Sequence, residues 1–210
     1  MIGGRGGRAS IRARLSPSPR KHVIAGGMHR LFVALRPPET IRDHLIDTME
    51  GLDGARWQSD DQLHLTLRFI GEVDAMQAED LASALAHVRL APFVLRLRGV
   101  GTFEHKGHTT ALWARVEESE PLAILHRRVE RACRAAGLEP ERRKFVPHVT
   151  IARTNTSTGP VGDWLAKHGR LALPDWPVDR FHLVESRLER GGAHYEPVVE
   201  FALSGPSPPP

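Results

Sequence analysis

Two copies of a His-x-Thr-x tetrad are the residues of this sequence whose types and spacing are best suited to chemistry. They are His64-Leu65-Thr66-Leu67 and His148-Val149-Thr150-Ile151. Residues i and i+2 of a β-strand point to the same face, so each histidine would share a face with its threonine while apolar residues line the opposite face. If the two strands lie side by side, two imidazoles and two hydroxyls converge on one site.

This set of side chains suits the hydrolysis of a phosphodiester. A neutral histidine can take a proton from attacking water, while the other histidine, as imidazolium, gives a proton to the leaving oxygen. The ordinary histidine pKa of about 6.5 allows both protonation states near neutral pH. Threonine hydroxyls can donate to the non-bridging oxygens, where charge develops. Arg153 follows His148 by five residues and would bring a guanidinium, whose geometry matches phosphate.

Two other interpretations of the tetrads remain open. A His-x-Thr pair on a strand is often only the half-buried polar face of that strand. Two histidines could also bind a metal, but such sites usually have three or more protein ligands. The sequence contains no His-x-x-x-His, Asp-x-Asp or cysteine cluster to supply the others. We therefore expect neither a metal nor another cofactor.

The elements that would position the tetrads alternate between strands and helices. Apolar periodicity and capping signals predict strands at residues 31–35, 63–70, 93–97, 110–116, 148–152, 181–186 and 198–203. The same signals predict helices at residues 37–49, 78–88, 120–136 and 161–167. A turn at residues 104–108 would join two consecutive strands. Because this order contains hairpins, it favours an α+β fold with largely antiparallel sheets.

Composition places the chain among globular proteins. Of its 210 residues, 40% are hydrophobic and 26% are charged, and no run approaches the roughly 20 apolar residues of a membrane helix. The single cysteine, Cys133, cannot form an internal disulfide, and we expect it to be a small buried hydrophobe. These features predict a protein without membrane segments and, by default, a cytoplasmic location.

The net charge of +4 comes from one end of the chain. Residues 1–27 carry six basic and no acidic residues, and the remainder has a charge of −2, so bulk charge gives no argument for nucleic-acid binding. We predict that residues 1–27 form a basic tail, residues 28–204 the folded domain and residues 205–210 a second tail. The basic tail is either an arm attracted to RNA phosphates or an extension upstream of Met28.

Around the tetrads the sequence resembles the 2H phosphoesterases, and among them the RNA 2′,3′-cyclic phosphodiesterases, which are also called 2′-5′ RNA ligase-like proteins. The resemblance covers about residues 29–203, with its motifs at 30–35, 63–73, 99–103, 112–114, 145–153, 183–188 and 192–195. It implies a two-lobed α+β fold of two antiparallel sheets with outer helices, a central cleft and a pseudo-two-fold axis. One tetrad would come from each lobe.

The resemblance also implies an activity, namely the opening of an RNA-terminal 2′,3′-cyclic phosphate to a 2′-phosphomonoester without a cofactor. By analogy, His64 would be the acid that protonates O3′ and His148 the base that activates water. Thr66 and Thr150 would hold the phosphate oxygens, assisted by Arg153. The residues themselves do not choose between the two histidine roles.

Other residues and other functions are left open. Phe103 could stack on a nucleobase or belong to the core, and the stretch 104–108 is richer in histidine than is usual in the family. The basic run at residues 142–144 is either a solvated surface or a path for RNA. The same chemistry on small cyclic nucleotides or ADP-ribose cyclic phosphate is an alternative function, and an RNA-end-binding protein without turnover is another. We expect a monomer.

Overall fold

The computed structural model describes residues 26–189 and 192–205. The proposed tails therefore lie almost wholly outside the described residues. In chain order the elements are β1 (Met28–Leu35), α1 (Glu39–Ile46), β2 (Arg56–Trp57), a 3-10 turn η1 (Asp60–Gln62), β3 (Leu65–Asp74), α2 (Ala75–Leu85), β4 (Phe93–Leu95), β5 (Leu97–His105), β6 (His108–Val116), α3 (Glu120–Ala135), β7 (His148–Arg153), α4 (Gly162–His168), β8 (Trp176–Val178), β9 (Arg180–Glu189) and β10 (Gly192–Ala202).

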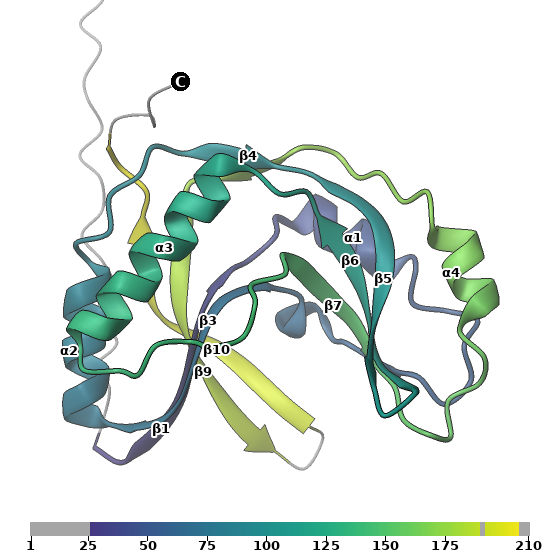
Figure 1. Ribbon diagram of the computed structural model, residues 1–210, viewed down its shortest axis with the longest axis horizontal. Helices are drawn as coiled ribbons and strands as arrows, with labels where there is room; N and C mark the ends of the chain where they lie inside the picture. The colour runs from purple at the N-terminus through teal and green to yellow at the C-terminus, as the bar shows by residue number, and fades with distance from the viewer. Residues whose placement is uncertain (1–25, 190–191, 206–210) are drawn as a thin grey trace, which may run out of the picture.

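The strands form two four-stranded sheets, one in each half of the molecule. The first has the order β10-β9-β1-β3 and the second the order β2-β7-β6-β5, while β4 and β8 form a separate pair. All of these pairings are antiparallel. Figure 1 shows the two sheets on either side of the molecule. The predicted two-lobed α+β fold with antiparallel sheets is thus confirmed.

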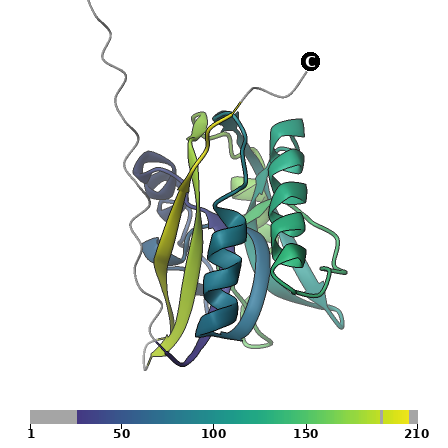
Figure 2. The same ribbon diagram turned by 90° about the vertical axis from the view of Figure 1, so that its left-hand side faces the viewer.

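Helices α2 and α3 pack against each other and against β3, and Figure 2 shows them side by side on one flank. The start of α3 follows its sequence signals: the Ser119 side chain accepts from the Leu122 N–H, and a proline stands in the first turn. In the other half, the Trp164 indole of α4 donates to the Thr48 carbonyl just after α1, at 2.9 Å. No helix within the described residues is long and apolar enough to span a bilayer.

One predicted strand is wrong. Residues 93–97 do not form a single element, because β4 ends at Leu95 and pairs with β8, whereas β5 starts at Leu97 and joins the second sheet. The predicted turn at residues 104–108 is confirmed, and it is a tight hairpin between β5 and β6. Its two turn residues, Lys106 and Gly107, have φ of 49° and 78°, as expected for a two-residue turn between right-twisted strands.

The strands that carry the tetrads are not neighbours in one sheet. β3 is an edge strand of the first sheet and β7 lies inside the second, and the two strands pack against each other. The expectation of one tetrad from each lobe is therefore confirmed, and the two tetrad strands meet at the contact between lobes rather than within one sheet. Each sheet contributes its own histidine and threonine.

A core shared by both lobes holds this arrangement. It includes the apolar members of both tetrads, Leu65, Leu67, Val149 and Ile151, each no more than 3% exposed. Full burial of such a side chain stabilises the fold by about 1.5–3 kcal/mol. Cys133 lies in the same core, as predicted, and its burial raises the pKa of the thiol to about 12. Burial of the apolar residues of each tetrad therefore fixes the strand, and with it the positions of the histidine and threonine on the opposite face.

Candidate active site

His64 stands directly before β3, where its ring is fixed by a local hydrogen bond. Its Nδ1 lies 2.6 Å from the carbonyl oxygen of Gln62. A carbonyl oxygen can only accept, so Nδ1 must carry the proton. In the neutral ring, Nε2 is then the unprotonated nitrogen, available to take a proton from a ligand.

His148 repeats this geometry in the second lobe. It is the first residue of β7, and its Nδ1 lies 2.7 Å from the carbonyl oxygen of Val146. In both tetrads the acceptor is the carbonyl two residues before the histidine. The two lobes thus present chemically equivalent imidazoles, each with Nε2 as its free nitrogen.

Thr66 and Thr150 lie where strand alternation predicts. Both are half-buried on the same side as their histidine, between fully buried apolar neighbours. Within residues 26–189 and 192–205, neither hydroxyl forms a hydrogen bond with the protein. Two hydroxyl donors are therefore available to a ligand beside the imidazoles.

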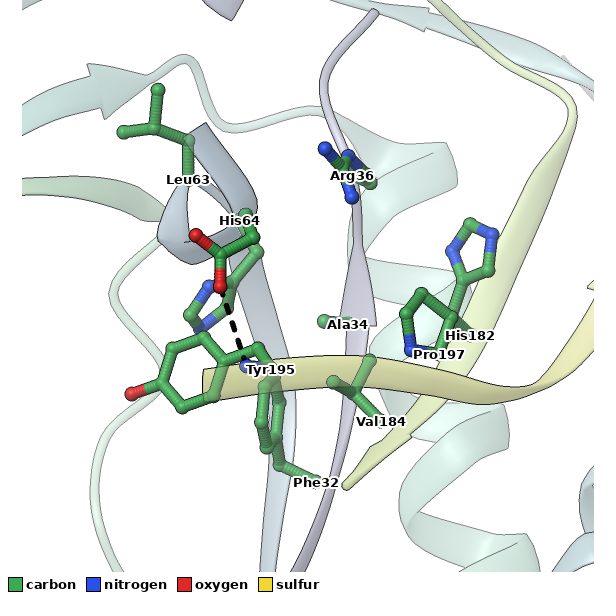
Figure 3. Close-up of a pocket in the computed structure, with 10 residues that line it drawn as sticks. Phe32, Ala34, Arg36, Leu63, His64, His182, Val184, Tyr195 and Pro197 are labelled. Carbon is green, nitrogen blue, oxygen red and sulfur yellow. Dashed lines mark hydrogen bonds between the residues drawn. The ribbon is translucent and has the colours of Figure 1, made fainter. Parts of the chain in front are cut away.

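Aromatic rings surround His64. The Phe32 ring lies 4.8 Å from the imidazole, and the Tyr195 ring lies 5.2 Å away in an edge-on arrangement. Figure 3 shows Tyr195 from β10 next to His64, with Phe32 beside them. Together with Ala34 and Val184, these two rings form a small apolar cluster separate from the main core. This cluster forms the wall that removes water from one side of His64.

His148 has a similar aromatic pair. Phe103 meets its ring edge-on at 4.8 Å, and Trp113 lies at 5.9 Å. Phe103 is half-buried and also packs on Trp113, at 5.2 Å. Phe103 is thus a neighbour of the second histidine rather than a member of the main core.

The two imidazoles and Arg153 interact electrostatically. Burial lowers the pKa of His64 to about 4, although its bond to Gln62 acts in the opposite direction, and the charges of His148 and Arg153 lower it further. Burial and the charge of Arg153 also lower the pKa of His148. Both histidines are therefore neutral near pH 7, and Arg153 is close enough to act on both.

A pocket of about 320 Å³ opens beside this centre. Arg153, the last residue of β7, lines it together with Arg56, the residue opposite on β2. Gln62 and Tyr195 also line it, which joins this pocket to the His64 wall. Two arginines thus line a pocket that shares Tyr195 with the aromatic wall beside His64.

Sequence reasoning missed several of these neighbours, namely Phe32, Arg56, Trp113 and Tyr195. One signal for Phe32 was present. Residues 31–35 are apolar without a break, and such a run needs both faces covered; one face meets the core and the other forms the site wall. Trp113 and Tyr195 fall within the motifs at residues 112–114 and 192–195 that carry the family resemblance, although no site role was assigned to them there. Arg56 depends on a contact between distant strands, for which the sequence holds no local signal.

Other singled-out residues lie elsewhere. His105 and His108 are exposed at the end of the β5–β6 hairpin. In the run at residues 142–144, Arg143 pairs with Glu141 at 2.6 Å and its guanidinium covers the Phe69 ring. Among the described residues, no group of three or more histidine, cysteine, aspartate or glutamate side chains is placed to hold a metal ion.

Comparisons with known proteins agree with this fold. The model of the 2′-5′ RNA ligase superfamily matches residues 37–190. An RNA 2′,3′-cyclic phosphodiesterase of Thermus thermophilus is 35% identical over 191 residues, covering 84% of this chain and 91% of that protein. One of Geobacillus stearothermophilus is 32% identical over 161 residues, covering 76% of this chain, and the chain spans only 51% of that protein's length.

A solved structure shows the same architecture. The crystal structure of E. coli LigT complexed with 3′-AMP superimposes with a TM-score of 0.70 at 26% identity, covering 85% of this chain and all of that one. The fold and these relatives define the protein as an enzyme of the cyclic phosphodiesterase class. The chain belongs to the 2′-5′ RNA ligase superfamily.

Proposed function

We propose that this enzyme hydrolyses the 2′,3′-cyclic phosphate at the end of an RNA chain to a 2′-phosphomonoester. The observation that carries the proposal is the matched pair of histidines, each with Nδ1 bonded to a carbonyl oxygen two residues earlier. Each ring thereby keeps Nε2 free for one proton transfer. The relatives of Thermus thermophilus and Geobacillus stearothermophilus are RNA 2′,3′-cyclic phosphodiesterases, which supports the choice of substrate.

The reaction moves one proton through each histidine. A neutral Nε2 takes a proton from water while the water oxygen bonds to phosphorus. The bond between phosphorus and O3′ breaks, and O3′ takes a proton from the other histidine. The bond to O2′ stays, which gives the 2′-phosphomonoester. Two histidines in opposite protonation states at the start have exchanged those states at the end.

The remaining side chains would hold the substrate. Thr66 and Thr150 donate to the non-bridging oxygens, and Arg153 balances the charge that develops there. Phe103 offers a ring face for a nucleobase, a contact worth about 1–3 kcal/mol per base. Its edge-on contact with His148 supports a position for such a base near the reacting phosphate.

The family resemblance assigns His64 as the acid and His148 as the base. Before the substrate binds, this order is demanding, because the pKa of His64 is lowered to about 4. The negative charge of a bound phosphodiester favours the imidazolium and raises that pKa. We therefore propose that His64 gains its proton together with the substrate.

The first experiment measures turnover. An oligonucleotide ending in 2′,3′-cyclic phosphate is incubated with enzyme in EDTA, and phosphorus NMR identifies the product. We expect a 2′-phosphate, and a loss of about 10²- to 10⁴-fold in kcat for His64→Ala and for His148→Ala. Arg128→Gln, an exposed position on α3, serves as the control. A loss of less than about threefold for either histidine variant contradicts the mechanism.

A second experiment assigns the two roles. A substrate with sulfur in place of O3′ has a leaving group that needs no proton. If His64 is the acid, this substrate restores activity to His64→Ala and leaves His148→Ala inactive. Restoration of His148→Ala instead would reverse the assignment while leaving the two-histidine mechanism intact.

A further inference from the structure

Two arginines stand directly opposite each other in a way that costs stability. Arg56 of β2 pairs with Arg153 of β7, and like charges directly opposite on neighbouring strands repel. Both side chains line the 320 Å³ pocket. Within the part of the chain that the structure describes, neither guanidinium forms a salt bridge or hydrogen bond. Two unneutralised cations at one end of a pocket indicate an anionic ligand.

The other charged groups of this pocket do not neutralise the pair. Asp61, its one carboxylate among the described residues, lies 3.2 Å from the Nδ1 of His194. It also accepts from the Ser59 hydroxyl and from the backbone N–H of Tyr195. Because Asp61 is held by these donors, the two guanidiniums remain available.

The two arginines have different places relative to the histidines. The charge of Arg153 contributes to the lowered pKa of both His64 and His148, whereas Arg56 contributes to neither. Arg153 also lies on β7, the strand that carries His148, whereas Arg56 lies on the neighbouring edge strand β2. Arg153 is therefore the inner member of the pair and Arg56 the outer one. A ligand that binds both arginines must carry one negative charge near the histidines and a second one near Arg56.

An RNA end carries charge in this pattern. The nucleotide with the terminal cyclic phosphate is joined through its 5′ oxygen to an ordinary phosphodiester, whereas a cyclic mononucleotide with a free 5′-hydroxyl has no second charge. We propose that Arg56 binds the phosphodiester on the 5′ side of the cyclic phosphate, with Arg153 between the two phosphates. This inference rests on the proposed function and makes Arg56 a residue that selects RNA chains over cyclic mononucleotides.

The test compares two substrates of different length. One is a dinucleotide ending in 2′,3′-cyclic phosphate and the other is the corresponding cyclic mononucleotide with a 5′-hydroxyl. In the wild type, we expect the dinucleotide to have the higher kcat/KM. Arg56→Gln should reduce the ratio of the two kcat/KM values by about tenfold, the effect of one charged hydrogen bond of ordinary strength. Arg56→Lys, which keeps the charge, should retain part of the ratio.

Salt dependence gives an independent measurement. Each phosphate contact to a single strand contributes about −0.7 to the slope of log affinity against log salt concentration. The slope of log kcat/KM for the dinucleotide should therefore become shallower by about 0.7 in Arg56→Gln, and Arg128→Gln should keep the wild-type slope. The thermal midpoint of Arg56→Gln should equal or exceed that of the wild type, since the change relieves the repulsion with Arg153.

The outcomes separate this inference from the proposed function. Equal losses on both substrates, or a wild type that does not prefer the dinucleotide, overturn the role of Arg56 while the proposed hydrolysis stands. An enzyme that turns over neither substrate overturns the proposed function itself.

Discussion

Replacing His64 with glutamine should make the protein less sensitive to acid. Folding lowers the pKa of His64 from 6.5 to about 4, because the buried ring is more stable without its charge. The unfolded chain therefore binds a proton that the native state does not. Above pH 6.5, His64 is neutral in both states and does not change the free energy of unfolding. As the pH falls from 6.5 towards about 4, protonation of His64 in the unfolded chain alone lowers that free energy progressively.

The size of this effect follows from the shift. A change of 2.5 in pKa corresponds to about 3 kcal/mol once the pH is below both values. Between about pH 7 and about pH 4.5 the same linkage gives a loss of about 2 kcal/mol. In His64→Gln this contribution is absent, while the other titrating groups are unchanged.

The assay is urea unfolding of both proteins at the two pH values. Each free energy of unfolding is extrapolated to water, and a constant urea dependence shows that the same transition is compared. For each protein, the free energy of unfolding at the lower pH is subtracted from that at the higher pH. The packing and hydrogen bonds that the substitution removes affect both terms equally and cancel. We expect the wild type to lose about 2 kcal/mol more than His64→Gln on acidification. Equal losses would refute the assignment of a buried neutral imidazole at this position.

Three further predictions concern the surroundings of the site. Arg153→Gln should move the pH profile of kcat/KM to higher pH, because the positive charge of Arg153 lowers the pKa of both histidines; a profile that stays in place or moves to lower pH contradicts this. Gly101→Ala should lower the free energy of unfolding by about 1–3 kcal/mol, because the added Cβ would come within 2.5 Å of the Trp113 ring. Since Trp113 packs on His148, kcat should fall as well; calorimetry tests the first effect and steady-state kinetics the second. Cys133 should react with a thiol reagent only at the rate of unfolding, because it is fully buried and its pKa is raised to about 12; rapid labelling of the native protein at neutral pH would contradict this.

The parts of the fold that follow from local signals were predictable from the sequence. The start of α3 is one example, because a serine cap and an early proline act within one helical turn. The alternation of each tetrad is another, because the pleat of a strand alone decides that His148 and Thr150 share a face. Such features need no knowledge of the rest of the chain.

The features that were missed depend on distant partners. β5 contains two glycines and its residues are mostly half-buried, so it lacks the apolar alternation by which strands are found; its pairing with β6 makes it a strand. The two-residue strand β2 exists only because β7 lies beside it. The same dependence hid the site residue Arg56, whose pairing with Arg153 spans almost 100 positions of sequence.

The roles of the candidate site residues are still predictions. The structure brings His148 and Arg153 close enough to His64 for their charges to lower its pKa, and each threonine lies on the same strand face as its histidine. The sequence identified these residues because the same four-residue pattern occurs twice, and such a repeat can be seen without knowing which strands meet.

The short bond from each histidine to the carbonyl two residues before it has a consequence for how the two halves can vary. Within three consecutive residues, each lobe fixes which nitrogen is free and which way its ring faces. The span between the two rings is fixed separately, by how β3 packs on β7. Substitutions at the contact between lobes can therefore change the span between the two rings while both histidines keep their tautomers.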